Sequence, residues 1–496
     1  MNEKDRQETN LQETKPQEIN SQEIKLNLEQ NELNTSGSSH VKKEMGANRL
    51  GELPVGKLLL EFSVPAIIAM IANALYNVID SIFVGRGVGS LALTAVTIAF
   101  PIMIILMAFA MLIGIGATAM ISLKLGQQKK DDAERILGTA FASSVVVGVS
   151  LTVIFLIFLD PLLLFLGATP DVFLYAKQFS TVILIGAVFQ FLSFGLNNII
   201  RAEGNPVISM ATMLFSAGMN CLLNPLFIFV FHWGVIGSAL ATVTTQILVS
   251  AYIIYHFTIG KSNLKLHKKY FRLAPDLMGK IASIGLSPFL LQLAASVTLF
   301  IFNSHLLEYG GEMAVAAMGV INRTAMMLLM PIFGINQGAQ PIIGYNYGAK
   351  KYDRVRKTLR LASIAATAIC IFGFVLSELF SPQIIGLFNK EQELIAIGTR
   401  GIRIFMLMIP VVGVQIVITN YFQAVGKASK AILLSLTRQV LFLIPLILIL
   451  PSFFRLDGIW MAGPISDFSS SMLAIVLLVK EFRYLQDKHD EGSSLR

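Results

Sequence analysis

Charged residues are scarce in this chain: Asp, Glu, Lys and Arg make up only 14% of its 496 residues, whereas 54% are hydrophobic. The apolar runs are longer and more numerous than the buried core of a soluble domain requires. The formal net charge is +8, but the excess sits in short loops between apolar runs, so it is a topology signal and does not indicate nucleic-acid binding. The composition therefore excludes a soluble globular protein.

Other absences narrow the chemistry. The only two cysteines, Cys221 and Cys370, lie far apart in apolar segments, and the six histidines are scattered. We therefore expect no metal site and no other cofactor, and we interpret the cysteines as small core residues. No GxxxxGK[ST] motif is present, so energy for any transport must come from an ion gradient and not from ATP. Nothing in the chain indicates an enzyme.

Residues 1–50 form a separate polar tail. It begins with a five-residue repeat, QETNL-QETKP-QEINS-QEIKL, and has almost nothing to bury, so we expect it to be disordered or at most a marginal solvated helix. No apolar run precedes it, which argues against a secretory signal peptide. An inert tail and a regulatory, partner-binding tail both remain open.

Twelve apolar segments follow, each long enough to cross ~30 Å of hydrocarbon as a helix. They are residues 57–85, 91–123, 132–159, 171–200, 205–231, 235–259, 276–307, 312–345, 353–380, 391–421, 427–451 and 457–482. Their length and lack of polar alternation exclude a closed barrel. The fold class is therefore an all-α membrane protein with twelve transmembrane helices.

The loops indicate the orientation. Lys and Arg cluster at residues 129–130, 261–272, 350–357 and 427–430, after even-numbered segments, whereas the alternate loops are poor in both. The positive-inside rule then places the even-numbered loops and both termini in the cytoplasm. We expect a multi-pass protein of the cell membrane, surrounded by lipid and monomeric.

An internal repeat at an offset of about 222 residues divides the chain into two halves. The sequence NIIRAEG at 198–204 recurs as NYFQAVG at 420–426, and the region 113–131 recurs at 335–353. Each half contains six spans, so the two copies share orientation and form two lobes related by a pseudo-twofold axis along the membrane normal, as in secondary transporters. The predicted units are a tail at 1–50, a first lobe at 51–260, a basic cytoplasmic linker at 261–275, a second lobe at 276–482 and a cytoplasmic tail at 483–496.

Asp80 is an ionisable residue inside the first span. Asn73, Tyr76 and Asn77 precede it at intervals that place all four side chains on one face of a helix. A carboxylate inside hydrocarbon is costly and usually faces a protein interior or a wet cavity. We predict that Asp80 binds the coupling ion. The alternative is a structural carboxylate hydrogen-bonded to a neighbouring helix.

Other polar residues in the spans are candidates for the same cavity. Asn220 and Asn224 lie at a depth similar to that of Asp80, as a shared site requires. Further polar faces comprise Gln190, Ser193 and Asn197 in the fourth span and Ser238, Thr242 and Thr245 in the sixth. These faces either line the cavity or hold helices together through hydrogen bonds.

Three charges fall near the middle of spans in the second lobe: Arg323, Arg438 and Asp467. An unpaired charge there would be expensive, so the economical explanation is a buried network that pairs the acid with arginine. We favour a structural or gating role over contact with substrate.

Three longer motifs lie in the apolar spans: Pro65…Asp80-Ser-Ile-Phe-Val-Gly85, Asn220-x-x-x-Asn224-Pro225-Leu-Phe-Ile-Phe229 and Gly334-x-x-Gln337-Gly338-x-x-Pro341-x-x-Gly344-x-Asn346-x-Gly348. They resemble motifs of the multidrug and toxic compound extrusion (MATE) family, most closely those of its MepA-type branch. The resemblance covers about residues 50–480. It implies a secondary active multidrug exporter that exchanges amphiphilic, often cationic, drug-like compounds for H⁺ or Na⁺ by alternating access.

The chain departs from the family pattern at one position. The branch with a pair of coupling carboxylates has an Asp where this chain has Asn224, which leaves Asp80 as the only first-lobe acid well inside the membrane. This favours a single coupling site and weakens, without excluding, Na⁺. The rival function is a flippase for lipids or lipid-linked oligosaccharides with a related two-lobe fold. It is disfavoured because such a cavity needs several cations and the first lobe's spans have almost no Lys or Arg.

Overall fold

The computed structural model describes residues 48–388 and 391–494, and helices account for nearly all of them. The polar repeat of the predicted tail lies outside the described residues. The first lobe contains α2 (Val55–Gly87), α3 (Ser90–Gly126), α4 (Lys130–Ile157), α5 (Leu159–Phe165), α6 (Pro170–Ala202), α7 (Pro206–Pro225), the π-helix η1 (Leu226–Val230) and α8 (Gly234–Thr258).

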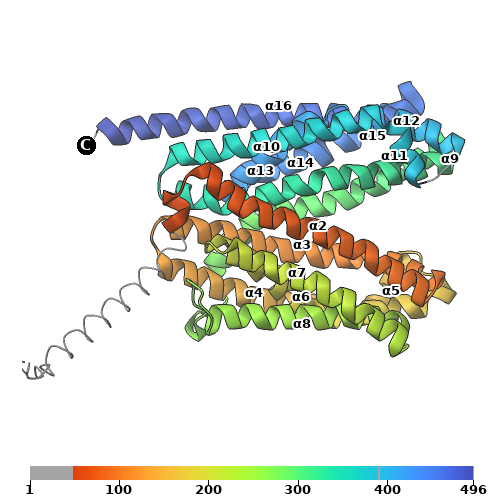
Figure 1. The fold of residues 1–496 in the computed structure, drawn as a ribbon, viewed down its shortest axis with the longest axis horizontal. Coiled ribbons are helices and arrows are strands. Elements are labelled where there is room, and N and C mark those ends of the chain that lie inside the picture. The colour runs from red at the N-terminus through yellow and green to blue at the C-terminus, as the bar shows by residue number, and fades with distance from the viewer. Residues whose placement is uncertain (1–47, 389–390, 495–496) are drawn as a thin grey trace, which may run out of the picture. The chain divides into compact units, whose positions relative to one another are not determined.

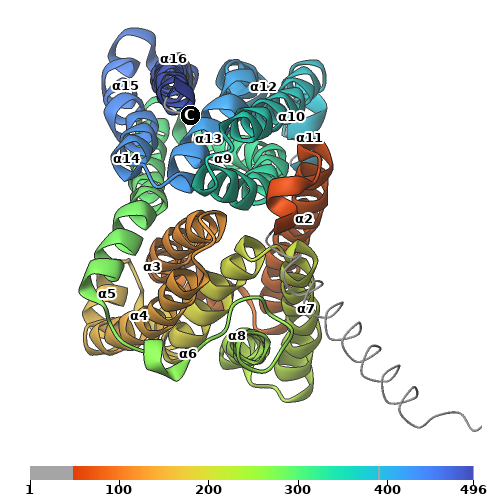
Figure 2. The same ribbon diagram turned by 90° about the vertical axis from the view of Figure 1, so that its left-hand side faces the viewer.

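The second half begins with the short 3₁₀-helix η2 (Lys268–Tyr270) of the linker. It continues with α9 (Pro275–Gly348), α10 (Tyr352–Leu379), α11 (Ser381–Phe388), α12 (Gln392–Met406), α13 (Ile409–Ala424), α14 (Ala428–Leu436), the π-helix η3 (Thr437–Leu443), α15 (Ile444–Ile449) and α16 (Pro451–Ser494). Figure 1 shows these helices running along a common direction. In Figure 2, α3, α4, α6, α7 and α8 gather in one group, and α10 and α12 to α16 gather in another.

The predicted all-α, twelve-span architecture is confirmed. Among the described residues, ten helical stretches are long and apolar enough to cross a membrane, and α12 with α13, bent by 48° relative to each other, makes an eleventh. One of the ten, α9, consists of two helices joined at Gly311, where φ is 66° and ψ is −169°. The break in the tenth predicted span falls just before Pro410, whose ring cannot continue the preceding helix.

The backbone carries the same repeat as the sequence. Positive φ occurs at Gln128 and Lys350 (59° and 58°), and again at Gly204 and Gly426 (102° and 76°), each pair being separated by 222 positions. The first pair ends α3 and α9 identically, with a backbone hydrogen bond from the following residue back into the last turn of the helix. The two lobes are therefore copies of one six-helix unit.

The lobes meet where the C-terminal ends of α3 and α9 cross. A Cβ atom on Gly126 would lie 2.0 Å from the carbonyl oxygen of Tyr345, and a Cβ on Gly348 would lie 2.2 Å from the carbonyl oxygen of Leu123. The repeat relates these two contacts to each other, because Gly126 corresponds to Gly348 and Leu123 to Tyr345. Only glycine permits backbones to approach so closely.

We call the end of the bundles that carries loops 127–129, 203–205, 259–274, 349–351 and 425–427 the basic end. Residues 48–52 at this end are helical, and α16 continues helically to Ser494.

Candidate functional site

Asp80 is half-buried near the far end of α2, facing α7 and α8. The side-chain amide of Asn224 donates a hydrogen bond to Oδ1 of Asp80, and Oγ of Ser238 lies 3.5 Å from the same oxygen. These partners come from three different helices, so the contact fixes α2 against α7 and α8. No basic side chain forms an ion pair with Asp80 among the described residues.

Two buried amide oxygens belong to the same cluster. Asn220 and Asn224 are one helical turn apart on α7 and are 3% and 1% exposed. Nδ2 of Asn220 donates to Oγ1 of Thr242 at 3.2 Å, whereas Oδ1 of both asparagines has no hydrogen-bond partner in the described structure. A buried acceptor without a donor is unfavourable. The cluster therefore has a carboxylate that can bind a proton, and a carboxylate with two amide oxygens that can coordinate a small cation.

The other predicted residues of α2 lie on the same stretch of helix. The hydroxyl of Tyr76 is paired with Thr242, which joins Tyr76 to the α8 side of the cluster. Asn73 is exposed. Asn77 lies in α2, but its side chain falls outside the described residues.

Gln190 and Asn197 occupy α6. Oδ1 of Asn197 accepts a 2.7 Å hydrogen bond from Thr212, and its Nδ2 lies 3.5 Å from the carbonyl oxygen of Ser209, so Asn197 holds α6 against α7. Gln190 is half-buried. Neither residue forms a hydrogen bond with Asp80 within the part of the chain that the structure describes. The structure thus brings Asn220 and Asn224, but not these two, to the carboxylate cluster.

In the second lobe, Nε of Arg438 donates to Oδ1 of Asp467 at 2.6 Å, and Ser466 donates to the backbone oxygen of Arg438 at 2.6 Å. The Asp467 side chain is 9% exposed and that of Arg438 24%. Arg323 is exposed and has no ion pair within the part of the chain that the structure describes. The acid is therefore paired with Arg438, and Arg323 stands apart from the pair.

Sequence reasoning missed two residues of the NIIRAEG segment. Arg201, 5% exposed, donates one hydrogen bond to Asn198 and another across the lobe boundary to Gln337. The sequence signal for Arg201 is a basic residue directly after the apolar segment 171–200.

Glu203 is the second missed residue and is fully buried. Its Oε1 lies 2.6 Å from Nε2 of His256, and Oγ of Ser262 donates to its other oxygen. Glu134 plays a similar part, because its carboxylate accepts from the backbone N–H of Lys265 at 3.0 Å. Two acids of the first lobe therefore anchor the linker that leads to the second.

Comparison with known proteins agrees with this architecture. The family model described as MatE matches residues 65–226 and 288–449, one match in each lobe. A curated relative named Multidrug export protein MepA, from Staphylococcus haemolyticus (strain JCSC1435), is 27% identical over 427 residues, which cover 86% of this chain and 94% of the relative. The relative of the same name from Staphylococcus aureus (strain MSSA476) is 26% identical over 426 residues, with the same coverage.

A solved structure has the same fold. It is described as the outward-facing conformation of a multidrug resistance MATE family transporter and is 25% identical, with a TM-score of 0.83 over 89% of this chain and 98% of that one. The comparisons give no support to the flippase alternative. The chain belongs to the MatE family of multi-pass membrane transporters and is not an enzyme.

Proposed function

We propose that this transporter exports amphiphilic and cationic drug-like compounds in exchange for protons, with Asp80 as the coupling residue. The relatives named as multidrug export proteins span nearly the whole chain, which supports drug-like substrates. The observation that carries the coupling role is the contact between Asp80 and Asn224 beside two unpartnered amide oxygens. Asp80 is the carboxylate of this cluster, and the amides and hydroxyls around it do not change their charge near neutral pH.

Protonation changes what the cluster can do. As a carboxylate, Asp80 accepts from Asn224 and Ser238 and attracts a cation. As a carboxylic acid it also donates one hydrogen bond, for which the free oxygens of Asn220 and Asn224 are acceptors. Protonation would therefore remove the negative charge and repack α2 against α7, which lowers the affinity for a cationic substrate. Deprotonation on the other side of the membrane would reset the site.

Alternating access is supported by where the lobes touch. The close approaches of α3 to α9 (Gly116 to Ile281 and Gly126 to Tyr345) and of α2 to α9 (Ser63 to Gly338) lie in the halves of the spans next to the basic end. With that end in the cytoplasm, this arrangement corresponds to a cytoplasmic side that is closed. Rocking of one lobe against the other would break these contacts and expose the site to the other side.

The test is uptake of a fluorescent cationic drug into proteoliposomes that contain the purified protein. An imposed pH gradient is expected to drive accumulation, and collapse of the gradient with a protonophore should abolish it. An imposed Na⁺ gradient without a pH gradient should have little effect. Accumulation driven by a Na⁺ gradient alone would mean that the coupling ion is Na⁺, held by Asp80 and the amide oxygens. If neither gradient drives accumulation, the protein is not a secondary active exporter.

The orientation is a separate proposal: a plasma-membrane protein with the basic end and both termini in the cytoplasm. It rests on the excess of Lys and Arg in the loops of the basic end. A reporter fused after Lys268 should read cytoplasmic, and one fused after Glu391 should read external. The reverse result for both fusions would overturn this orientation.

A further inference from the structure

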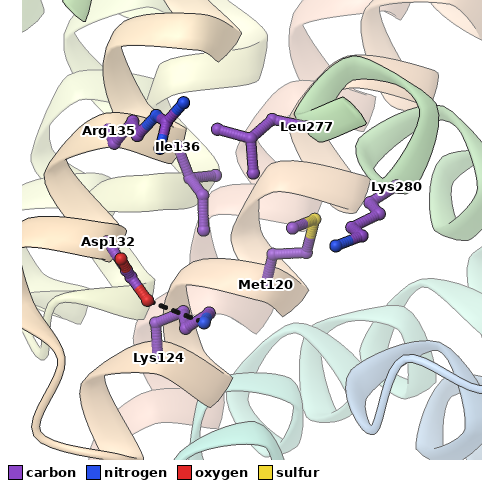
Figure 3. Close-up of a pocket in the computed structure, with 7 residues that line it drawn as sticks. All are labelled: Met120, Lys124, Asp132, Arg135, Ile136, Leu277 and Lys280. Carbon is purple, nitrogen blue, oxygen red and sulfur yellow. Dashed lines mark hydrogen bonds and ion pairs between the residues drawn. The ribbon is translucent and has the colours of Figure 1, made fainter. Parts of the chain in front are cut away.

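A small charged cavity that does not include Asp80 lies at the basic end between the two lobes. Its volume is about 120 Å³, and it is lined by Lys124, Asp132, Arg135 and Lys280 together with three apolar side chains. Figure 3 shows Lys124 and Met120 on one helix, Asp132 and Arg135 on a second, and Lys280 opposite them on a third. These helices are α3, α4 and α9. The cavity is smaller than the roughly 300–1,000 Å³ of a typical site for a drug-sized ligand.

The cavity has an excess of positive charge. Lys124 is paired with Asp132 at 2.8 Å, whereas neither Arg135 nor Lys280 has an ion pair among the described residues. The cavity is also lined by the first turns of α4 and α9, which begin at Lys130 and Pro275, and helix N-termini carry partial positive charge. The arrangement therefore suits a small anionic group.

The repeat supplies an internal comparison. The positions of Lys124 and Asp132 correspond to Asn346 and Arg354 in the second lobe. There the groove is filled by the chain itself, because Nδ2 of Asn346 donates to the carbonyl oxygen of Leu50 at 2.9 Å and Nη2 of Arg354 donates to that of Leu53 at 2.6 Å. The donors of the second lobe thus have acceptors provided by residues 50–53.

Among the described residues, no segment fills the groove of the first lobe in this way. The chain that precedes α9 packs against α4 instead, where Phe271 stacks on Phe141 with ring centroids 4.9 Å apart and Tyr270 covers Gly138. The groove between α3, α4 and α9 is therefore left as a cavity with cationic walls. Backbone carbonyls of residues 50–53 fill the groove of the second lobe. The corresponding groove of the first lobe has room for a hydrogen-bond acceptor from another molecule.

We propose that this cavity binds the phosphate of an anionic membrane lipid and thereby links the two lobes at the basic end. Basic pockets between transmembrane helices on the cytoplasmic side are suited to acidic lipid headgroups, and the apolar residues Met120, Ile136 and Leu277 provide a surface for the adjoining chain. Arg135 belongs to the first lobe and Lys280 to the second. A bound phosphate therefore favours the conformation in which these two residues stay close.

The experiment uses the purified full-length protein in phosphatidylcholine nanodiscs. Phosphatidylglycerol is titrated into the discs, and binding is followed by the thermal melting midpoint and by native mass spectrometry of retained lipid. The variant Arg135→Gln/Lys280→Gln should weaken phosphatidylglycerol binding about fivefold for each charge removed, or about 25-fold in total. Both residues are exposed, so the variant should fold normally.

The matched control is Lys57→Gln/Lys357→Gln. These exposed residues occupy the corresponding places in the repeat and the charge change is identical, but in their half of the repeat residues 50–53 supply the acceptors. The control should retain phosphatidylglycerol as well as the wild type does. Equal losses in the two double variants would show a general surface-charge effect and overturn the site.

Two further arms complete the test. The single variant Asp132→Asn removes the one acid of the cavity and should strengthen phosphatidylglycerol binding, which a variant that is merely destabilised would not do. Inorganic phosphate added to discs of phosphatidylcholine alone should leave the melting midpoint unchanged. If inorganic phosphate stabilises the wild type as well as the lipid does, and the cavity variant loses this effect, the ligand is a soluble phosphate and the lipid assignment is wrong.

Discussion

The two lobes are copies of one repeated unit, but the membrane-buried carboxylate of each lobe has different partners. Asp80 in the first lobe contacts neutral donors, from Asn224 and Ser238. Asp467 in the second lobe contacts the guanidinium of Arg438 at 2.6 Å. Protonation of a carboxylate that is paired with an arginine breaks an ion pair, whereas protonation of one held by amides and hydroxyls breaks none. The comparison supports our proposals that Asp467 stabilises the second lobe and that Asp80 is the coupling residue.

The largest expected effect on stability comes from breaking the second lobe's pair. Asp467→Asn leaves Arg438 without its partner in a low-dielectric region and should lower the free energy of unfolding by about 3 kcal/mol. The measurement is the melting midpoint and folded yield of the purified variant. The double variant Arg438→Met/Asp467→Leu, which removes both charges, should recover most of the loss. Normal stability of Asp467→Asn with altered drug affinity would contradict the structural role.

A second test exchanges a residue between the copies. Glu203 occupies the place that Val425 has in the second lobe. Glu203→Val removes the carboxylate that holds His256 of the first lobe and Ser262 of the linker. The expected loss is about 2 kcal/mol of unfolding free energy, measured in the same melting assay. The exposed acid Glu52 provides the control, since Glu52→Val should change the midpoint little. Equal effects of the two substitutions would mean that Glu203 does not anchor the linker.

The smallest effect concerns the contact across the lobes. Arg201 corresponds to Gln423 in the second copy, and Arg201→Gln should remove its charge-assisted hydrogen bond to Gln337, worth about 1.5 kcal/mol. Spin labels at the exposed positions 129 and 350 would report the separation of the lobes at the basic end. We expect the population with a longer separation to rise about tenfold. An unchanged distance distribution would mean that Arg201 does not help to hold the two lobes together at the basic end.

Much of the fold could be predicted from the sequence because hydrophobic length and the repeat are properties of the chain itself. The shared depth of Asp80 and Asn224 likewise anticipated their contact. The anchoring of the linker by Glu203 and Glu134 could not be predicted, since it pairs acids with residues 53 to 131 positions away. Nor could periodicity separate Arg323 from Arg438, because which arginine reaches Asp467 depends on how α9 and α16 pack.

Asp80 as the coupling residue is tested most directly by pH-gradient-driven drug uptake into proteoliposomes that contain purified Asp80→Asn. The asparagine keeps the size of the side chain and cannot titrate. We expect the variant to be folded, to bind a cationic drug and to equilibrate it without accumulation, while Asp80→Glu retains part of the wild-type accumulation. Accumulation by Asp80→Asn at the wild-type rate under the same pH gradient would contradict coupling through this residue.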